Sequence, residues 1–392
     1  MVLRREHMNK HIYITTLHLQ HGGVEMAITQ LANALIIRGY EVTLLCTYNL
    51  GAPVYTLDKN VKIQYLTNVK PNKAELKQCL EKKAYFSFLK QGVYAVKVLY
   101  LKHCTMKRAL QKIQRDIIIS SRNEHSVLMS KYANPEVRKI AQLHHDHDFS
   151  PKYIKDFRNK YKNIDKFVVL TEELKKEIEA FWDGYNSHTK CIVIPNFVSN
   201  EGMVTKEKRE NTVLAVGRIH PVKGFTRLIK VWQKVIEIEP SWKLKIIGDG
   251  DLAEKAIIEK LITANGLEGR VIMPGALPHK DVMDQMGKAK IFAMTSFSEG
   301  FPFVLIEAMQ NGLPVVAYDV RVGPRAIIQQ GENGFLIPDN EIELYAEKIM
   351  FLMRESVECE RMSKNAKCRA LEFTEKQVME KWEKILGGAD EL

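Results

Sequence analysis

Residues 295–319, TSFSEGFPFVLIEAMQNGLPVVAYD, predict a strand end, a tight loop, a helix and a second strand. The apolar runs on either side are typical of buried strands, and Pro302 suits the first turn of the helix between them. Such a βαβ unit belongs to an open parallel sheet, in which ligands collect beyond the carboxyl ends of the strands. Taken alone, Glu299 and Glu307 would be a solvated loop residue and an exposed helix residue. Whether they bind a ligand depends on the rest of the chain.

The same order of strand, loop and helix recurs on both sides of a polar segment, residues 199–211. Strands are predicted before it at residues 12–17, 41–46, 116–120, 140–143 and 167–170, and after it at 213–216, 244–247, 271–273, 290–295 and 315–318. Residues 191–197 close the first half. A chain of 392 residues is also too long for one ordinary core. We therefore expect two parallel-sheet α/β domains, residues 1–198 and 199–372, with a deep cleft between them. Residues 342–370 should be helical, and a final helix should begin near residue 373.

The net charge of +11 is concentrated in one segment. Residues 70–115 contain twelve lysines and arginines but only two acidic residues, Glu75 and Glu81. Residues 72–114 are predicted to be helical, with apolar side chains between the lysines. A basic amphipathic segment can lie on anionic lipid, bind nucleic acid or form a solvated helical hairpin. No nucleic-acid-binding motif accompanies it, so no nucleic-acid partner is expected.

The chain lacks the sequence signals of secretion and membrane insertion. Arg4 and Arg5 are followed by residues too polar for the core of a signal peptide. No apolar run reaches the roughly 18 residues that a membrane-spanning helix needs. The six cysteines form no C-x-x-C pair, so neither a zinc site nor a disulfide framework is indicated. We expect a reduced, cytoplasmic protein.

Gly22 and Gly23 lie between the first predicted strand and the first predicted helix. A glycine pair there lets backbone N–H groups approach a ligand closely, although a simple tight turn explains it equally well. The pair is not part of a G-x-G-x-x-G sequence, which argues against a dinucleotide-binding dehydrogenase.

Histidines and aspartates follow the strand at residues 140–143, in the sequence His144-His145-Asp146-His147-Asp148. These residue types can bind zinc or iron, but adjacent residues rarely converge on one ion. A histidine at the carboxyl end of a strand is better interpreted as a hydrogen-bonding or polarising group. Residues 146–148 and 249–251 both have a D-x-D pattern.

In the second half of the chain, each predicted strand ends in a loop that contains glycine. Arg218 and Lys223 lie in the first of these loops, and Glu299 lies in the last. A phosphate group bound at this edge would meet two cations and the N-terminus of a helix.

Two of these motifs resemble those of glycosyltransferase family 4. They are GR-x4-KG, which contains Arg218 and Lys223, and E-G-F-P-x3-I-E, which runs from Glu299 to Glu307. The resemblance covers nearly the whole chain. It implies a retaining, sugar-nucleotide-dependent enzyme with the GT-B fold, which has two Rossmann-like domains and a C-terminal helix that returns to the first domain. It also implies that cations take the place of a metal, so no metal and no other cofactor is expected.

The resemblance also implies roles for individual residues. The donor diphosphate is expected to bind Arg218, Lys223, Gly22, Gly23, Phe303 and Val304. The donor sugar is expected to contact Glu299, Gly300, Phe301 and Pro302, and the ribose Glu307. The base is expected to lie against Pro274, Gly275, Ala276 and Leu277. His144, or His145 in its place, would hydrogen-bond near the sugar. Catalysis is assigned to Glu299, His144, Arg218 and Lys223, and whether Glu299 acts as a nucleophile or only positions the sugar is left open.

The expected reaction transfers a sugar from a nucleoside diphosphate, with uridine favoured, to a glycan or a lipid-linked acceptor. Bacterial cell-surface polysaccharide or glycoconjugate synthesis is the expected context. Lys82, Lys83, Lys107 and Arg108 would form a membrane or acceptor surface, with the enzyme peripheral on the inner face of the membrane. Two alternatives are a sugar-nucleotide epimerase or hydrolase of the same architecture and a basic nucleic-acid-binding protein.

Overall fold

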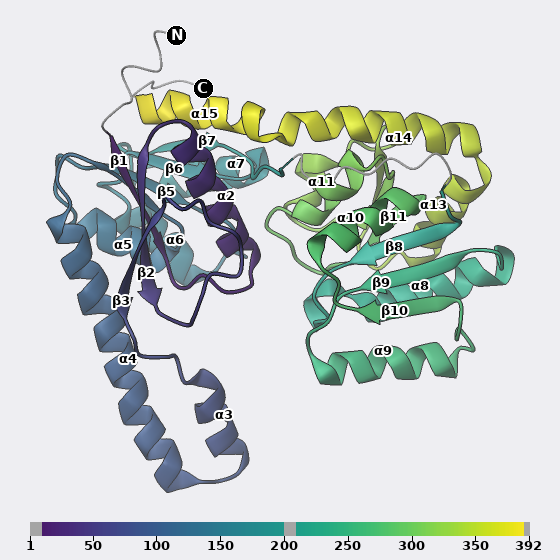
Figure 1. Ribbon diagram of the computed structural model, residues 1–392, viewed down its shortest axis with the longest axis horizontal. Helices are drawn as coiled ribbons and strands as arrows, with labels where there is room; N and C mark the ends of the chain where they lie inside the picture. Colours follow the sequence, from purple (N-terminus) through teal and green to yellow (C-terminus); the bar gives the residue numbers. More distant parts are fainter. Residues whose placement is uncertain (1–9, 200–208, 388–392) are drawn as a thin grey trace. The chain divides into compact units, whose positions relative to one another are not determined.

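The computed structural model describes residues 10–199 and 209–387, which form two α/β units (Figure 1). Unit 1 comprises Met1–Val169, Glu173–Ile194 and Trp382–Leu392, and unit 2 comprises Leu170–Glu172 and Pro195–Lys381. The chain thus passes into unit 2 at Pro195, slightly before the expected boundary after residue 198. Most of the polar segment at 199–211 lies outside the described residues.

Unit 1 contains a parallel sheet and the helices that connect its strands. Its elements are β1 (His11–Thr16), α2 (Gly23–Ile37), β2 (Glu41–Tyr48), β3 (Lys62–Thr67), α3 (Lys73–Glu81), α4 (Tyr85–Lys112), β4 (Ile117–Ser120), α5 (Asn123–Tyr132), β5 (Arg138–Gln142), α6 (Pro151–Lys160), β6 (Lys166–Val169), α7 (Glu172–Trp182) and β7 (Lys190–Val193). The strand order is β3-β2-β1-β4-β5-β6-β7, with every pair parallel. The central strands are apolar runs because both faces of the sheet are covered.

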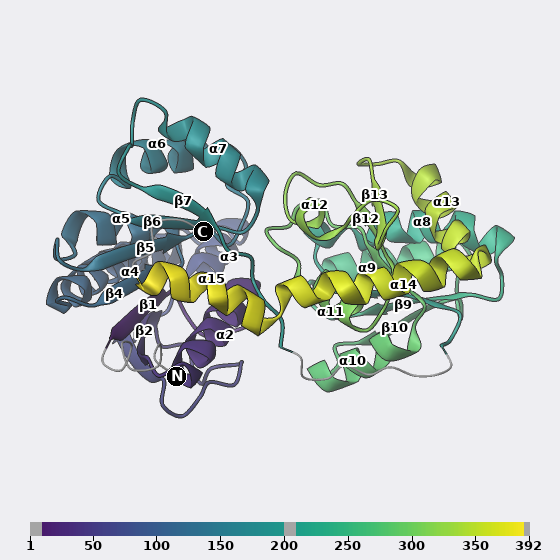
Figure 2. The ribbon, with the colours of Figure 1, turned by 90° about the horizontal axis from the view of Figure 1, so that it is seen from above.

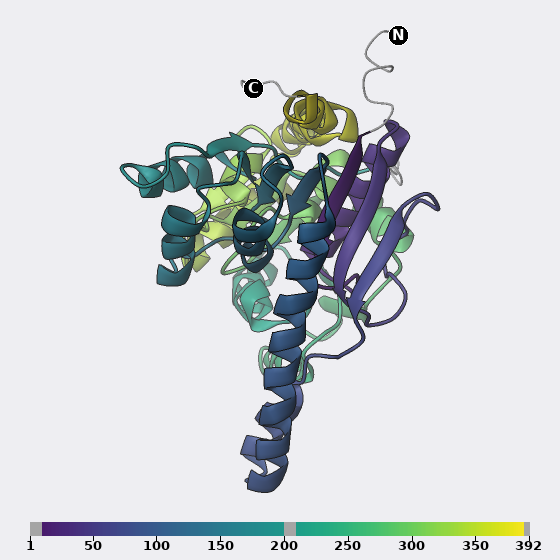
Figure 3. The same ribbon diagram turned by 90° about the vertical axis from the view of Figure 1, so that its left-hand side faces the viewer.

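Helices α3 and α4 form a hairpin that extends beyond the sheet of unit 1 (Figures 1 and 3). The turn between them runs through Lys83, whose backbone is left-handed with φ 52°. The buried side chains of α4 are Val98, at its midpoint, and Met106 and Leu110 near its end. Within the described residues, neither α4 nor any other helix is long and apolar enough to cross a membrane.

Unit 2 repeats the alternation of strands and helices. Its elements are β8 (Thr212–Val216), a 3₁₀ turn (Pro221–Lys223), α8 (Phe225–Ile238), β9 (Lys243–Ile247), α9 (Leu252–Ala264), β10 (Val271–Gly275), α10 (His279–Lys288), β11 (Ile291–Met294), α11 (Phe303–Gln310), β12 (Val315–Tyr318), α12 (Pro324–Ile327), β13 (Gly334–Ile337), α13 (Ile342–Arg354), α14 (Ser356–Ala370) and a second 3₁₀ turn (Leu371–Phe373). Two apolar cores form, which include Trp232 and Tyr345 in one and Phe292 and Leu305 in the other.

The sheet of unit 2 has the order β10-β9-β8-β11-β12-β13. From β8 the chain moves outward to β9 and β10, and it then returns to β11 on the other side of β8. The strand order therefore reverses between β8 and β11, which makes the carboxyl edge of these two strands the switch point where open α/β sheets bind ligands. In unit 1 the corresponding reversal lies between β1 and β4.

Three edge strands, β3, β7 and β13, were not predicted from the sequence, and several boundaries were misplaced. β3 was not predicted because its side chains are mostly part-exposed and lack a clear apolar pattern. β13 was not predicted because it is only four residues long and its first residue, Gly334, was assigned to the turn before it. The helix expected at 342–370 is broken at Glu355 into α13 and α14. Pro302 lies immediately before α11 instead of in its first turn, with ψ 101°.

The C-terminal helix α15 (Glu375–Gly387) begins in unit 2, and its last turns belong to unit 1 (Figure 2). The return of this helix to the first domain was expected. The Arg138 guanidinium donates hydrogen bonds to the carbonyl oxygens of Ile385 and Leu386, at 3.3 and 2.7 Å. A second arginine, Arg38, forms a 3.0 Å ion pair with Glu383. Arg138 thus satisfies carbonyl groups at the end of α15 that have no partner within the helix.

Replacing Arg138 with methionine should lower the free energy of unfolding by about 2 kcal/mol, because both helix-end carbonyls lose a charged donor. The exposed pair of Lys62 and Glu41, at 3.1 Å, provides a matched control, and Lys62→Met should change stability little. Urea unfolding measures both. Equal effects of the two substitutions would contradict this account of the anchoring of α15.

Candidate functional site

An ion pair joins the two loops at the switch point of unit 2. The Lys223 Nζ donates to Glu299 Oε1 at 2.6 Å, and Ser296 Oγ donates to the same oxygen at 2.5 Å. The side chains of Glu299 and Lys223 are 10% and 26% exposed. The carboxylate is therefore held by two donors on one oxygen, and the structure brings together two residues that are 76 positions apart in the sequence.

Gly224 allows these two loops to approach each other. Its φ of 63° is left-handed, and a Cβ there would collide with the carbonyl oxygen of Thr295. Thr295 Oγ1 in turn donates to the Gly224 carbonyl oxygen at 3.0 Å, and the Phe297 N–H donates to the Val222 carbonyl at 2.8 Å. The positions of the Lys223 and Glu299 loops are thus coupled by backbone contacts.

Arg227, in the first turn of α8, holds the loop that carries Glu299. Its Nε and Nη2 donate to the carbonyl oxygens of Thr295 and Ser296 at 2.6 and 2.5 Å. Its Nη1 forms a 2.6 Å ion pair with Asp339, and the guanidinium lies over the rings of Phe297 and Tyr318. The side chain is only 7% exposed. Arg227 was not among the predicted site residues, although a charged residue among the buried positions of α8 is a usable signal.

Arg218 lies in the first loop with its side chain exposed. Its guanidinium has no hydrogen bond or ion pair with any residue that the structure describes. The backbone on either side is fixed, because the Gly217 N–H donates to Ile247 O at 3.0 Å and the Ile219 N–H donates to Asp249 O at 3.0 Å. Arg218 is therefore a positioned cation that can bind an anion.

Helix α11 begins at this edge, at Phe303, after Glu299, Gly300, Phe301 and Pro302. The N–H groups of Phe303 and Val304 fall in the first turn of the helix, where no partner exists within the helix. The Phe301 side chain is buried and contacts Phe373 at 5.6 Å between ring centroids. At Phe301, therefore, only the backbone can face a ligand.

Glu307 lies one turn into α11 and is paired with a residue that the sequence did not indicate. Its Oε1 is 3.1 Å from Nε2 of His279, at the start of α10. The Glu307 side chain is 12% exposed and His279 is 57% exposed.

The segment expected to contact a base lies at the end of β10. Pro274 and Gly275 are the last residues of that strand, which is longer than predicted, and Ala276 and Leu277 follow it. The Gly275 carbonyl accepts a 3.0 Å hydrogen bond from Gly248 at the end of β9. All the predicted donor-site residues of unit 2 thus lie at or beyond the carboxyl ends of its strands.

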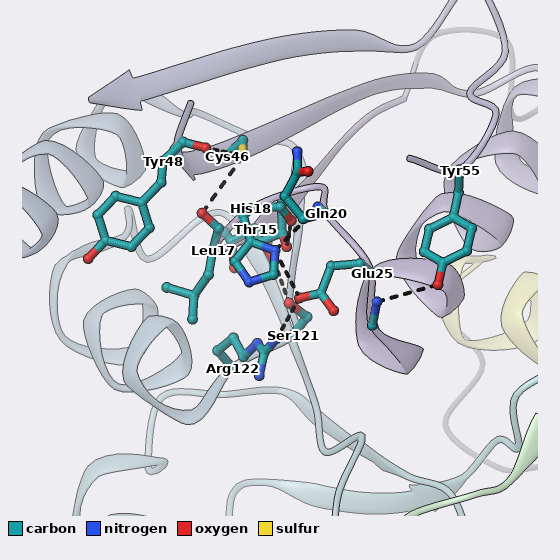
Figure 4. Close-up of polar contacts among 12 residues, drawn as sticks. Thr15, Leu17, His18, Gln20, Glu25, Cys46, Tyr48, Tyr55, Ser121 and Arg122 are labelled. Carbon is teal, nitrogen blue, oxygen red and sulfur yellow. Dashed lines mark hydrogen bonds and ion pairs between the residues drawn. The ribbon is translucent and has the colours of Figure 1, made fainter. Parts of the chain in front are cut away.

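Glu25 follows the Gly22–Gly23 segment of unit 1, and Figure 4 shows its side chain between His18 and Arg122. This buried carboxylate forms a 2.6 Å ion pair between its Oε1 and Nη2 of Arg122, which follows β4, and lies 3.7 Å from Nδ1 of His18. A Cβ on Gly22 would collide with the other carboxylate oxygen. The pair connects the first turn of α2, which follows β1, with the segment that follows β4, so the switch point of unit 1 also carries an acid and a base. Sequence analysis did not identify Glu25 or Arg122 as site residues.

His144 follows β5, and its imidazole is buried. Its Nε2 is 3.2 Å from Gln142 Oε1, and its Nδ1 has no hydrogen-bond partner among the described residues. Burial, reinforced by the charge of Arg122, lowers the pKa of His144 to about 3. His145 lies 2.8 Å from the Tyr153 hydroxyl, and burial lowers its pKa as well. His144 is therefore a neutral hydrogen-bonding group at neutral pH.

The two D-x-D sequences serve local backbone geometry. Asp251 caps the N-terminus of α9 by accepting from the N–H groups of Ala253 and Glu254. Asp146 accepts a 2.8 Å hydrogen bond from the N–H of Asp148. Across residues 10–199 and 209–387, no three His, Cys, Asp or Glu side chains are arranged to hold a metal ion.

Arg227→Met should lower the free energy of unfolding by about 3 kcal/mol, because two buried carbonyl groups and Asp339 lose their donor. Arg354 forms an exposed 2.7 Å pair with Glu239, and Arg354→Met should cost less than about 1 kcal/mol. Urea unfolding compares the two. If Arg227→Met is no more destabilising than the control, Arg227 does not hold the Glu299 loop.

The stability of the protein should depend on pH through two buried histidines. Burial lowers the pKa of His125, like that of His144, from 6.5 to about 3. Below pH 6.5 these two histidines take up protons in the unfolded chain but not in the folded chain. The stability that comes from keeping them neutral is therefore fully present above pH 6.5 and is lost as the pH falls toward 3. Each histidine should lower the free energy of unfolding by about 1.4 kcal/mol per pH unit in that window. Urea unfolding at several pH values measures the slope, and an unchanged slope in the double variant His125→Asn/His144→Asn would contradict the assignment.

Comparisons with known proteins agree with the fold and with the motifs at these edges. Residues 21–201 match the family model for Glycosyltransferase Family 4, and residues 200–369 match that for Glycosyl transferases group 1. An uncharacterized glycosyltransferase of Haemophilus influenzae is 28% identical over 93% of this chain and 96% of its own length. A Campylobacter jejuni enzyme, named as an alpha-1,4-N-acetyl-D-galactosaminyltransferase that acts on a diNAcBac-PP-undecaprenol glycan, is 24% identical over 94% of this chain and 96% of its own.

Among solved structures, the pneumococcal O-GlcNAc transferase GtfA in complex with UDP and GlcNAc superposes with a TM-score of 0.74. It shares 16% sequence identity and covers 98% of this chain and 99% of its own. This likeness confirms the predicted fold class, two Rossmann-like units of the GT-B type. The two matched models, which together extend over residues 21–369, place the protein in the group 1 and family 4 glycosyltransferases.

Proposed function

We propose that the protein is a retaining hexosyltransferase that uses a UDP-sugar and builds a bacterial cell-surface polysaccharide or glycoconjugate. The observation that carries this proposal is the pair of Lys223 and Glu299 at the switch point of unit 2, beside exposed Arg218 and the start of α11. The UDP-bound structure of GtfA and the undecaprenol-linked substrate in the name of the C. jejuni relative support the choice of donor and of acceptor class.

Cleavage of a glycosyl–phosphate bond leaves negative charge on the departing diphosphate. Arg218 and Lys223 would stabilise that charge, together with the N–H groups of Phe303 and Val304 at the start of α11. Lys223 uses one of its three N–H donors on Glu299, so the ammonium can bridge the carboxylate and a phosphate oxygen. The proposed reaction therefore needs no metal ion.

Glu299 would position the donor sugar. Both of its hydrogen bonds, from Lys223 and Ser296, go to Oε1, which leaves Oε2 to accept a bond from a sugar hydroxyl. The fixed carboxylate would also stabilise the positive charge that develops on the sugar ring. Glu307, paired with His279, is proposed to accept hydrogen bonds from the ribose, and the backbone from Pro274 to Leu277 to face the uracil.

Unit 1 is proposed to bind the acceptor, a glycan or a lipid-linked glycan. Neutral His144 would offer its buried, unpartnered Nδ1 to a ligand hydroxyl. A lipid-linked acceptor places the enzyme at a membrane surface. We therefore also propose peripheral association with the cytoplasmic leaflet through the basic α3–α4 hairpin, which carries Lys82 and Lys83 in its turn and Lys107 and Arg108 in α4.

A thermal-shift screen of nucleotide sugars tests the donor. A UDP-sugar at 100 times its dissociation constant should add about 2.7 kcal/mol to the stability of the native enzyme. Lys223→Ala should weaken donor binding by about tenfold to a hundredfold, whereas Glu299→Gln should bind UDP within a few-fold of wild type but lose most of its turnover.

Lys234→Ala is the matched control, because Lys234 forms an exposed 2.9 Å pair with Glu343 elsewhere in unit 2. It should leave binding and turnover unchanged. Wild-type kinetics in both site variants would overturn the site assignment. Stabilisation by guanosine sugars alone would overturn the choice of uridine.

A further inference from the structure

The α4 helix carries a row of large apolar side chains on the outside of the protein. We call this row the α4 stripe; it consists of Tyr85, Phe86, Leu89, Val93, Val96, Leu99 and Tyr100. Each of these side chains is 63–84% exposed. Single exposed apolar residues are common on protein surfaces, but a continuous row of this size marks an interaction surface.

The spacing of the stripe places it along one face of the helix. Phe86, Val93 and Tyr100 are seven residues apart, and Leu89 and Val96 follow the first two by three residues. This period of 3.5 residues keeps the side chains on one line over about four turns. The opposite face of α4 packs on unit 1 through Val98, Met106 and Leu110. The helix therefore already buries one apolar face, and the stripe is a second apolar face that remains exposed.

Cations border this line. Lys90 and Lys97 each directly follow a stripe residue, and Arg108 is eleven residues after Lys97, so intervals of two and three turns place all three along one flank. α4 contains six lysines and arginines and no acidic residue. The α3 helix adds Lys73 and Lys77, with Glu75 and Glu81 as its acidic residues.

We propose that the α4 stripe inserts into the acyl region of an anionic bilayer while the flanking cations bind lipid phosphates. This proposal rests on the membrane association proposed above and names the element and side chains responsible. An apolar row flanked by lysines is the pattern of a helix that lies in the plane of a membrane interface. Its length of about four turns favours a helix that lies flat over one that enters by its tip.

The charge and the apolar side chains of α4 favour an anionic bilayer over a second copy of this chain or a nucleic acid. A second copy of α4 would bring its own cations against those of the first, with no acidic residue on either helix to pair with them. A nucleic acid would satisfy the cations, but the aliphatic side chains of Leu89, Val93 and Val96 offer nothing that a phosphate backbone or a base edge recognises. An anionic lipid surface matches both the apolar row and the cations.

Vesicle co-sedimentation of the full-length protein tests the proposal, with phosphatidylcholine vesicles compared with vesicles that also contain phosphatidylglycerol. The native protein should bind only the anionic vesicles. Leu89→Ser/Val93→Ser should lower the partition coefficient about 100-fold, through the loss of two inserted side chains. Lys90→Gln/Lys97→Gln should lower it about 30-fold and weaken its dependence on salt.

Leu252→Ser/Ile257→Ser is the matched control, because both residues are exposed apolar side chains on α9 of unit 2. Its partition coefficient should equal that of the native protein. Circular dichroism checks that each variant is folded, and transfer to a water-soluble acceptor should be unchanged in the stripe variants. Lys223→Ala should bind vesicles normally, so a failure of the donor assignment is distinguishable from a failure of this proposal.

Three results would overturn the proposal. The first is native partitioning of Leu89→Ser/Val93→Ser, which would show that the stripe does not insert. The second is a dimer in sedimentation equilibrium that this variant dissociates, which would make the stripe an interface between copies. The third is binding to RNA, but not to anionic vesicles, that Lys90→Gln/Lys97→Gln abolishes.

Discussion

The candidate site of unit 2 depends on the guanidinium of Arg227, which holds the backbone of the Glu299 loop at two carbonyl groups. Neither carbonyl would otherwise have a charged donor, and the loop would lose its attachment to α8. Gly224 completes this attachment, because only a residue without a Cβ fits beneath Thr295. These contacts fix the two loops that carry Lys223 and Glu299. The geometry of their ion pair is therefore set by buried backbone interactions, and solvent-exposed side chains contribute little to it.

Both units have an ion pair at the point where the strand order of the sheet reverses. In each, the strand order reverses between two central strands, and an acid that follows one of these strands pairs with a base that follows the other. Glu25 and Arg122 form this contact in unit 1, and Glu299 and Lys223 form it in unit 2. The order of the two charges differs between the units. The acid follows β1 and the base β4 in unit 1, whereas the base follows β8 and the acid β11 in unit 2. In both units the pair neutralises charge at an edge where helix N-termini concentrate positive potential.

Sequence reasoning was reliable where burial dictates residue type. The apolar runs that became β8 and β12 were predictable because both faces of each strand are covered. β3 was not, because an exposed edge strand tolerates almost any pattern. The motif resemblance predicted that Lys223 and Glu299 belong to one site, but the hydrogen bond between them follows from sheet topology. Arg227 escaped notice because its partners are backbone carbonyl groups, which every residue carries.

The path of α15 has a consequence for the order in which the protein acquires its structure during synthesis. Trp382, Ile385 and Leu386 are buried, and they belong to unit 1 although they follow the whole of unit 2 in the chain. Domains usually fold from the N-terminus as the ribosome releases them. Here the first unit to emerge must wait for the last helix before its packing is complete. Until then the apolar surface that Trp382, Ile385 and Leu386 cover stays exposed to solvent.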